Sequence, residues 1–153
     1  MQLLELKVPP PAVLLLFAVM MWLLAAYVPS LAMAVPWHTP VALMVWSAGV
    51  AIAVAAVLEF RRAKTTVNPL NPEAASAMVT SGIYRFSRNP MYLGLLFALL
   101  GWAVWLSHLL AFSLLPLFVL YINRFQIEPE ERTLSVKFGG QFREYRGSVR
   151  RWL

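Results

Sequence analysis

The sequence predicts an all-α, polytopic membrane protein with about four transmembrane helices and a cytoplasmic, amphipathic carboxyl-terminal helix. Hydrophobic residues make up 60% of the 153 positions and charged residues only 13%. Soluble domains carry about 25% charged residues, so this chain has too few to cover a surface in water. Its two uncharged blocks, residues 8–58 and 89–123, each exceed the roughly 20 residues of one membrane-spanning helix. Each block therefore fits two spans.

The first block divides at a proline-rich connection. Pro29, Pro36 and Pro40 interrupt its apolar sequence and leave predicted helices over residues 11–28 and 40–60. The second of these helices is rich in small residues, which let a neighbouring helix approach closely. We expect it to pack through the series at four-residue spacing formed by Ser47, Ala51 and Ala55. Three further small residues lie nearby, namely Gly49, Ala53 and Ala56.

The second block divides at Ser107 and His108, its only adjacent polar pair. A tight hairpin at this pair separates predicted helices over residues 91–106 and 109–123. Gly94, on the first of them, is a candidate for close packing, although it also lies beside polar residues that are candidates for a binding site.

The charged segments orient the chain. Residues 59–88 and residues 124–153 each carry a net charge of +3. Because basic segments stay in the cytoplasm, both segments are expected there together with both chain termini. The expected membrane is the inner, cytoplasmic one. The alternative is a cleaved signal peptide, since the Ala-Met-Ala sequence at 32–34 resembles a cleavage site.

Polar residues ahead of the third helix suggest an anion site. The segment 65–72 contains two Asn-Pro pairs and is typical of turns. Asn89 is predicted to cap the helix and Pro90 to begin it. A helix amino terminus binds anions, and Arg85 and Arg88 lie close to it in sequence. Alternatively, these arginines contact anionic lipid headgroups.

The carboxyl-terminal segment is predicted to be an amphipathic helix that lies on the membrane surface. Its apolar stripe is interrupted at residues 139–140 and consists of Ile127, Leu134, Phe138, Phe142, Tyr145, Val149 and Trp152. The other face has Lys137, Arg143, Arg146, Arg150 and Arg151. Three acids, Glu128, Glu130 and Glu131, open the pattern. Anionic lipid would repel such a cluster unless it pairs with cations.

Two stretches share their order and spacing with a known family. They are Ser-Gly-Ile-Tyr at 81–84 with Arg-Asn-Pro-Met-Tyr-Leu-Gly at 88–94, and then Glu130, Glu131, Leu134, Phe138, Gly139 and Tyr145. The chain thereby resembles the isoprenylcysteine carboxyl methyltransferase and phospholipid methyltransferase family, specifically over residues 81–149. The prenyl-protein branch typically has Arg-His-Pro where this chain has Arg-Asn-Pro. An asparagine cannot accept a proton as an imidazole does.

The resemblance implies an integral membrane methyltransferase. It would use S-adenosyl-L-methionine at the cytoplasmic face and methylate a lipophilic acceptor, such as an isoprenylcysteine-type carboxylate, that enters from the bilayer. One domain is expected over residues 1–153, with two amino-terminal helices in residues 1–60 and the cofactor-binding core in residues 61–153. Methyl transfer from a sulfonium depends chiefly on alignment and requires no metal.

The expected cofactor-binding residues are Tyr84, Arg88, Asn89, Pro90, Tyr92, Gly94, Glu130, Glu131 and Tyr145. Arg88 and the helix start at Pro90 would hold the cofactor's carboxylate, and Glu130 or Glu131 its ammonium group. The three tyrosines would stack on adenine or lie over the sulfonium.

Two roles toward the acceptor are expected, one for a cation and one for a base. Arg124 would hold an anionic acceptor group, or else extend to the membrane surface as an ordinary basic residue. Glu131 or Tyr92 would take the proton if the acceptor is an amine.

Other functions stay open at this point. A membrane reductase of the sterol-reductase type would bind NADPH, with only Arg61, Arg62 and Lys64 to hold a second phosphate. A non-enzymatic membrane scaffold would need only the small-residue helix and the basic tail. The chain has no G-x-G-x-x-G motif, no cysteine and no aspartate, which excludes dinucleotide folds of the soluble type, thiolate metal sites and Ser-His-Asp triads. Expected partners are the acceptor and membrane lipids, with no nucleic acid; the acceptor's identity and the oligomeric state are left open.

Overall fold

The computed structural model describes residues 5–64 and 76–153, and within them it is helical. Five α-helices follow in order: α1 (Pro10–Tyr27), α2 (His38–Arg62), α3 (Pro90–Leu106), α4 (Leu109–Ile122) and α5 (Glu128–Ser148). A π-helical turn, η5 (Asn123–Ile127), joins α4 to α5, and a short 3-10 helix, η4 (Gly82–Arg85), precedes α3. The described residues form no extended strand, so the predicted all-α class is confirmed. The turn-forming segment 65–72 lies outside the described residues.

The four predicted spans correspond to α1, α2, α3 and α4, and each predicted boundary lies within two residues of the observed one. Three helical stretches are long and apolar enough to cross a membrane: α1, α2 and the continuous run Leu109–Ser148. In that last run the apolar part is α4, because α5 carries the acidic and basic residues. The helix α3 is also apolar but shorter, at 17 residues. The polytopic membrane architecture is therefore confirmed.

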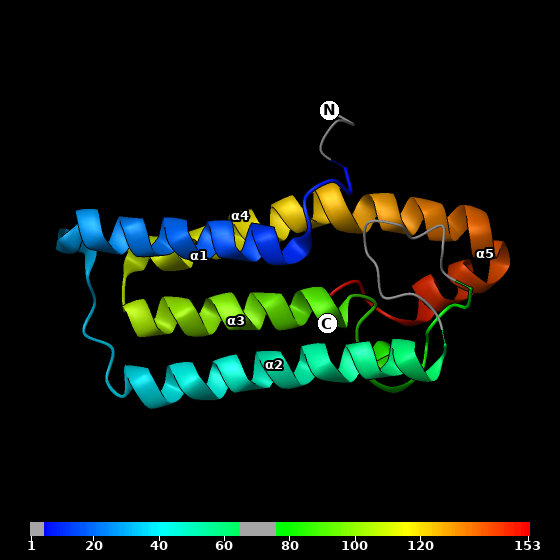
Figure 1. Cartoon of the computed structure of the whole chain (residues 1–153), viewed down its shortest axis with the longest axis horizontal. Coiled ribbons are helices and arrows are strands. Elements are labelled where there is room, and N and C mark those ends of the chain that lie inside the picture. The colour runs from blue at the N-terminus through cyan, green and yellow to red at the C-terminus, as the bar shows by residue number, and fades with distance from the viewer. Residues whose placement is uncertain (1–4, 65–75) are drawn as a thin grey trace.

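The core of the bundle lies between α1, α3 and α4, with α2 packed along the outer side of α3 (Figure 1). Phe17 of α1 meets Phe118 of α4 edge to face, with ring centroids 5.4 Å apart. The indole nitrogen of Trp102 donates a hydrogen bond to the Ala18 carbonyl at 3.0 Å and ties α3 to α1. As the helix that contacts all the others in the bundle, α3 sets the position of whatever is built at its ends.

Close backbone approach joins α2 to α3. A Cβ atom on Gly49 would lie 2.7 Å from the carbonyl oxygen of Gly94, and one on Gly94 would lie 2.7 Å from that of Gly49. Small residues on α2 therefore make the predicted close contact. The prediction of which side of α2 faces α3 was partly wrong. Ser47 and Ala51 of the four-residue series are exposed, whereas Gly49 and Ala56 are buried. Four-residue spacing drifts around a helix with 3.6 residues per turn, so it does not identify the packed face alone.

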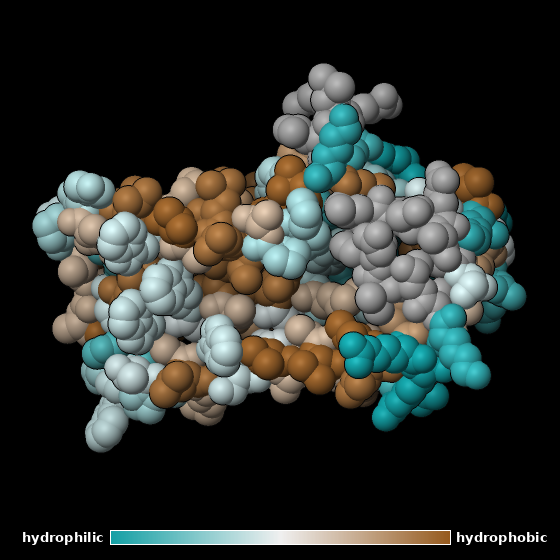
Figure 2. All heavy atoms as spheres, viewed as in Figure 1, coloured by the Kyte–Doolittle hydropathy of each residue, from teal (hydrophilic) through white to brown (hydrophobic). Residues whose placement is uncertain are grey.

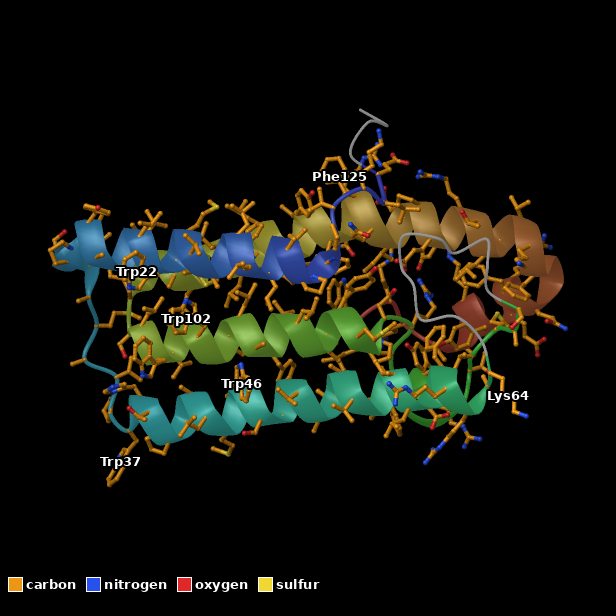
Figure 3. All side chains as sticks on the ribbon, viewed as in Figure 1. Trp22, Trp37, Trp46, Lys64, Trp102 and Phe125 are labelled. Carbon is orange, nitrogen blue, oxygen red and sulfur yellow. The ribbon has the colours of Figure 1, made fainter. Side chains whose placement is uncertain are left out.

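The two ends of the bundle differ in chemistry. Figure 2 shows strongly hydrophilic residues mostly at the end that holds α5 and the last turn of α2, with hydrophobic residues over the middle. Trp37 and Lys64 mark opposite ends of α2 (Figure 3). The predicted hairpin is confirmed at the end of the bundle that holds Trp37 and the end of α3. Ser107 adopts a left-handed conformation there, with φ of 49°. His108 contacts the Val28 carbonyl there at 2.8 Å.

Replacing Gly49 with alanine is expected to destabilise the protein by about 1–3 kcal/mol, because the added methyl meets the backbone of α3, which cannot move aside as a side chain does. This loss opposes the gain in helix propensity that the same change brings in an exposed helix. Unfolding of the detergent-solubilised variant measures it. Ala51→Leu is the control, since Ala51 is exposed on the same helix. Equal stability of the two variants would contradict the close-packing account.

Candidate functional site

The start of α3 lies at the charged end of the bundle. Pro90 occupies the first helical position, as predicted, and Asn89 occupies the cap position. The capping role predicted for the Asn89 side chain is wrong, because it makes no hydrogen bond to the first turn. Its amide nitrogen donates instead to the carbonyl of Arg151 at 3.0 Å. The Ser87 hydroxyl donates to the same carbonyl at 3.4 Å, so two residues ahead of α3 are bonded to the carboxyl-terminal segment.

The end of α2 is attached to η4, and this contact fixes Tyr84. Glu59 accepts a hydrogen bond from the Ser81 hydroxyl at 2.5 Å and from Arg62 at 2.7 Å. Gly82 turns the chain with φ of +58°, and a Cβ atom there would collide with the Glu59 side chain. Glycine is favoured at this bend because it adopts the left-handed conformation without strain and leaves room for the Glu59 side chain.

The helix α5 turns back on itself and closes the site. Gly139 has non-helical backbone angles, φ 50° and ψ −113°, at the point where the predicted stripe is interrupted. The helix reverses there (Figure 1). Phe142 and Tyr145, which follow the reversal, line the same cavity as Tyr92 of α3. The prediction of one surface helix is therefore corrected to a helical hairpin, with Phe142 buried inside the protein.

An ion network joins three separate segments of the chain. Glu131 accepts hydrogen bonds from Arg88 at 2.8 Å and from Arg151 at 2.7 Å. The side chains of Arg88 and Glu131 are only 10% and 11% exposed. Partial burial opposes ionisation of Glu131, but the hydrogen bonds from the two arginines prevail and hold its pKa below the usual value. The Glu131 carboxylate is therefore ionised and paired.

Most of the hydrogen-bond donors of the Arg88 guanidinium are used within the protein. Besides Glu131, it donates to the backbone carbonyls of Arg146 at 3.0 Å and Val149 at 2.8 Å. Its Nε is buried and has no partner among the described residues. These three hydrogen bonds use three of the five N–H donors of the guanidinium, so Arg88 does not offer the free fork expected from the sequence.

Glu130 has the opposite environment from its neighbour. Its carboxyl accepts a hydrogen bond from the Tyr92 hydroxyl, and no arginine within the described residues is bonded to it. Withdrawal from solvent raises the pKa of Glu130 to about 8, aided by the nearby charge of Glu131 and opposed by the Tyr92 hydrogen bond. Adjacent residues thus hold one protonated and one ionised carboxyl group at neutral pH. Such divergence between two neighbouring acids is characteristic of functional sites.

Two tyrosines meet beside these acids. The Tyr145 hydroxyl donates to the Tyr84 carbonyl at 2.7 Å. Burial raises the pKa of Tyr145 to about 12 and also raises that of Tyr84. The Tyr84 hydroxyl is buried and has no partner in the described part of the chain. A polar group without a partner costs free energy unless a ligand or water satisfies it.

These residues surround one cavity of about 100 Å³. Seven predicted site residues line it, namely Tyr84, Arg88, Asn89, Tyr92, Glu130, Glu131 and Tyr145. A larger, more open hollow of about 810 Å³ shares Ala77, Met78 and Tyr145 with the cavity and so adjoins it. Together they form a chamber whose inner part has a mostly apolar lining with a few polar groups, and whose outer part is open.

Three predicted site residues do not line the cavity. Pro90 only begins α3, and Gly94 packs against α2. Arg124 pairs with Glu5 at 2.8 Å and is bonded away from the cavity. Conversely, sequence analysis missed the contribution of Arg151, which it assigned to the polar face of a helix. The only signal in the sequence was that the acids opening α5 need cations to pair with.

The fold and site define an integral membrane protein with a helical ligand chamber at its charged end. Comparison with known families matches residues 37–141 to the phospholipid methyltransferase model. The chain belongs to this family and is a membrane methyltransferase, as its sequence motifs predicted. It is 51% identical to an uncharacterized protein of Haemophilus influenzae over 63 residues, which is all of that protein and 41% of this chain. No solved structure matches the chain.

Removing the charge of Glu131 is expected to destabilise the fold. Glu131→Gln leaves Arg88 and Arg151 without their anion, and loss of one partner from a buried ion pair costs about 3 kcal/mol. Denaturant unfolding of the purified protein measures the change. Glu128→Gln is the control, because Glu128 is 41% exposed and pairs with Arg124 at 3.7 Å only. A loss no larger than that of the control would mean that the network does not hold the site together.

Proposed function

We propose that the protein transfers a methyl group from S-adenosyl-L-methionine to a lipophilic acceptor at the cytoplasmic face of the inner membrane. The observation that carries this proposal is the cavity in which seven residues of the family-like motifs converge. Membership of the methyltransferase family supports the reaction class. The basic segments at the same end of the bundle support the cytoplasmic orientation, with both termini on that side.

The residues of the chamber match the groups of this cofactor in chemistry. The unpartnered Nε of Arg88 and the amide of Asn89 are donors for its carboxylate. Glu130 provides an anion for its ammonium or sulfonium charge once ionised. Tyr84 and Tyr145 provide aromatic surface for adenine, and the free hydroxyl of Tyr84 a hydrogen-bond donor. When bound, the cofactor supplies a methyl group on a positively charged sulfur.

Glu130 is better suited than Glu131 to handle a proton. Glu131 is held in its ionised form by two arginines, so it has little tendency to accept one. Glu130 is protonated near neutral pH and would ionise beside a bound cation, which readies it to accept a proton again. The hydroxyl of Tyr92, on α3, is hydrogen bonded to the Glu130 carboxyl.

The acceptor enters this proposal by chemical class. Candidates are an isoprenylcysteine-type carboxylate and a phospholipid amine. The structure places Arg124 on Glu5, so the cation expected to hold a carboxylate is already paired. A carboxylate acceptor would need no base, whereas an amine must lose a proton, for which Glu130 is positioned. The pH dependence of the rate with each acceptor distinguishes them.

Calorimetric titration with S-adenosylhomocysteine is the first test. We expect micromolar binding that Arg88→Ala and Glu131→Ala each weaken by about 1 kcal/mol or more, the scale of a lost hydrogen bond to a charged group. Arg143→Ala, an exposed residue on α5, is the matched control and should bind as the wild type does. Binding of NADPH in place of S-adenosylhomocysteine would indicate a reductase, and binding of neither a scaffold.

The affinity for S-adenosyl-L-methionine is expected to rise with pH up to about 8 and then to level off. The pKa of Glu130 is raised to about 8, so at lower pH its carboxyl must release a proton before it attracts the cation. Glu130→Gln removes this titration. Since the ligand's own ionisation is common to both proteins, the difference between their pH profiles isolates Glu130. Parallel profiles would exclude a charge contact between Glu130 and the ligand.

A further inference from the structure

The amino-terminal segment, residues 5–8, lies against the π-helical turn η5. The backbone nitrogen of Leu6 donates to the Phe125 carbonyl at 3.1 Å. The side-chain nitrogen of Gln126, which is fully buried, donates to the Val8 carbonyl at 2.7 Å. Figure 3 shows Phe125 at the junction of α4 and α5, beside this segment. Both hydrogen bonds thus attach the segment to the turn that carries the chain from the membrane into the site.

Glu5 connects the two sides of this turn. Its carboxylate binds Arg124 in η5 at 2.8 Å and also binds Arg132 of α5. The Glu5 side chain is only 13% exposed. The hydrogen bond from Arg124 is the main reason that the pKa of Glu5 lies below its usual value, so the group is ionised at neutral pH. Arg132 directly follows Glu131, and one carboxylate therefore links the end of α4 to the part of α5 that lines the cavity.

The π-helical turn η5 determines the direction in which the first residues of α5 point. A π-turn holds one more residue than an α-helical turn and is the less stable geometry. If η5 relaxed to α-helix, the following residues would shift by one position, which rotates a helix by about 100°. Glu130 and Glu131 would then turn away from Tyr92 and Arg88. A contact that stabilises the π form of η5 therefore also keeps Glu130 and Glu131 directed toward the cavity.

We propose that Glu5 is a positioning residue for the methyl-transfer site, and that its carboxylate keeps the first turn of α5 in register with α3 through Arg124 and Arg132. This inference rests on the proposed function. The family match begins at residue 37, so it does not include the amino-terminal segment. Arg124 accordingly acts through Glu5 on the placement of α5, in place of the direct contact with acceptor expected from the sequence.

The test uses the full chain in nanodiscs and compares Glu5→Gln with Lys7→Gln. Lys7 lies in the same segment and is exposed, so its substitution controls for changes in charge there. Each variant is titrated with S-adenosylhomocysteine and S-adenosyl-L-methionine across the pH range, and its melting temperature is measured. Arg132→Gln removes the same contact from the α5 side and serves if Glu5→Gln does not fold.

Glu5→Gln is expected to weaken binding of S-adenosylhomocysteine about fivefold, since the acids are no longer held in place. The pH at which S-adenosyl-L-methionine affinity levels off should fall by about one unit, as Glu130 becomes less enclosed. The melting temperature should change little, because Arg124 and Arg132 are 39% and 57% exposed and such pairs stabilise weakly.

Two outcomes overturn the inference. If Glu5→Gln matches Lys7→Gln in affinity and in pH profile, Glu5 has no positioning role even though the wild type binds. A lowered melting temperature with unchanged affinity and pH profile would assign Glu5 a purely structural role. Failure of the wild type itself to bind either ligand would instead overturn the proposed function, together with the inference that rests on it.

Discussion

The ion network of Arg88, Glu131 and Arg151 is the interaction on which the site depends. It joins the segment before α3, the first turn of α5 and the carboxyl-terminal segment at one point. Removing such charges from water is costly, and their mutual attraction offsets this only with good geometry and further hydrogen bonds. Arg88 has these bonds, to the carbonyls of Arg146 and Val149. The network therefore selects one arrangement of the three segments.

This arrangement explains why adjacent acids differ in ionisation. On a helix, neighbouring side chains point about 100° apart, so Glu130 and Glu131 face different surroundings. Glu131 points toward Arg88 and Arg151 and forms ion pairs with both. Glu130 points toward Tyr92 and the apolar start of α3, where it is shielded from both cations. Because Glu130 is withdrawn from solvent and bonded to neither arginine, it stays protonated in the chamber while its neighbour is ionised.

The sequence predicts the elements well and their contacts less well. Uncharged blocks, prolines and the Ser107–His108 pair locate four helices closely because desolvation and proline geometry act locally. The side chain of Asn89, the pairing of Arg151 and the reversal at Gly139 depend on partners that are distant in sequence. Likewise, no local pattern distinguishes the π-turn η5 from ordinary helix. Seven residues predicted from the family motifs nonetheless line one cavity, because such motifs reflect residues that meet in the folded structure.

Packing within the membrane also shapes the chamber at its end. The contact of Gly49 with Gly94 sets how closely α2 approaches α3. Farther along α2, Ala56 and Phe60 pack on Tyr84, and the rings of Phe60 and Tyr84 meet edge to face at 5.5 Å. A wider separation of the two helices would withdraw Phe60 from Tyr84 and open the cavity to solvent. Because the raised pKa of Glu130 arises from its removal from solvent, the glycine contact in the apolar region contributes to the protonation state of the site.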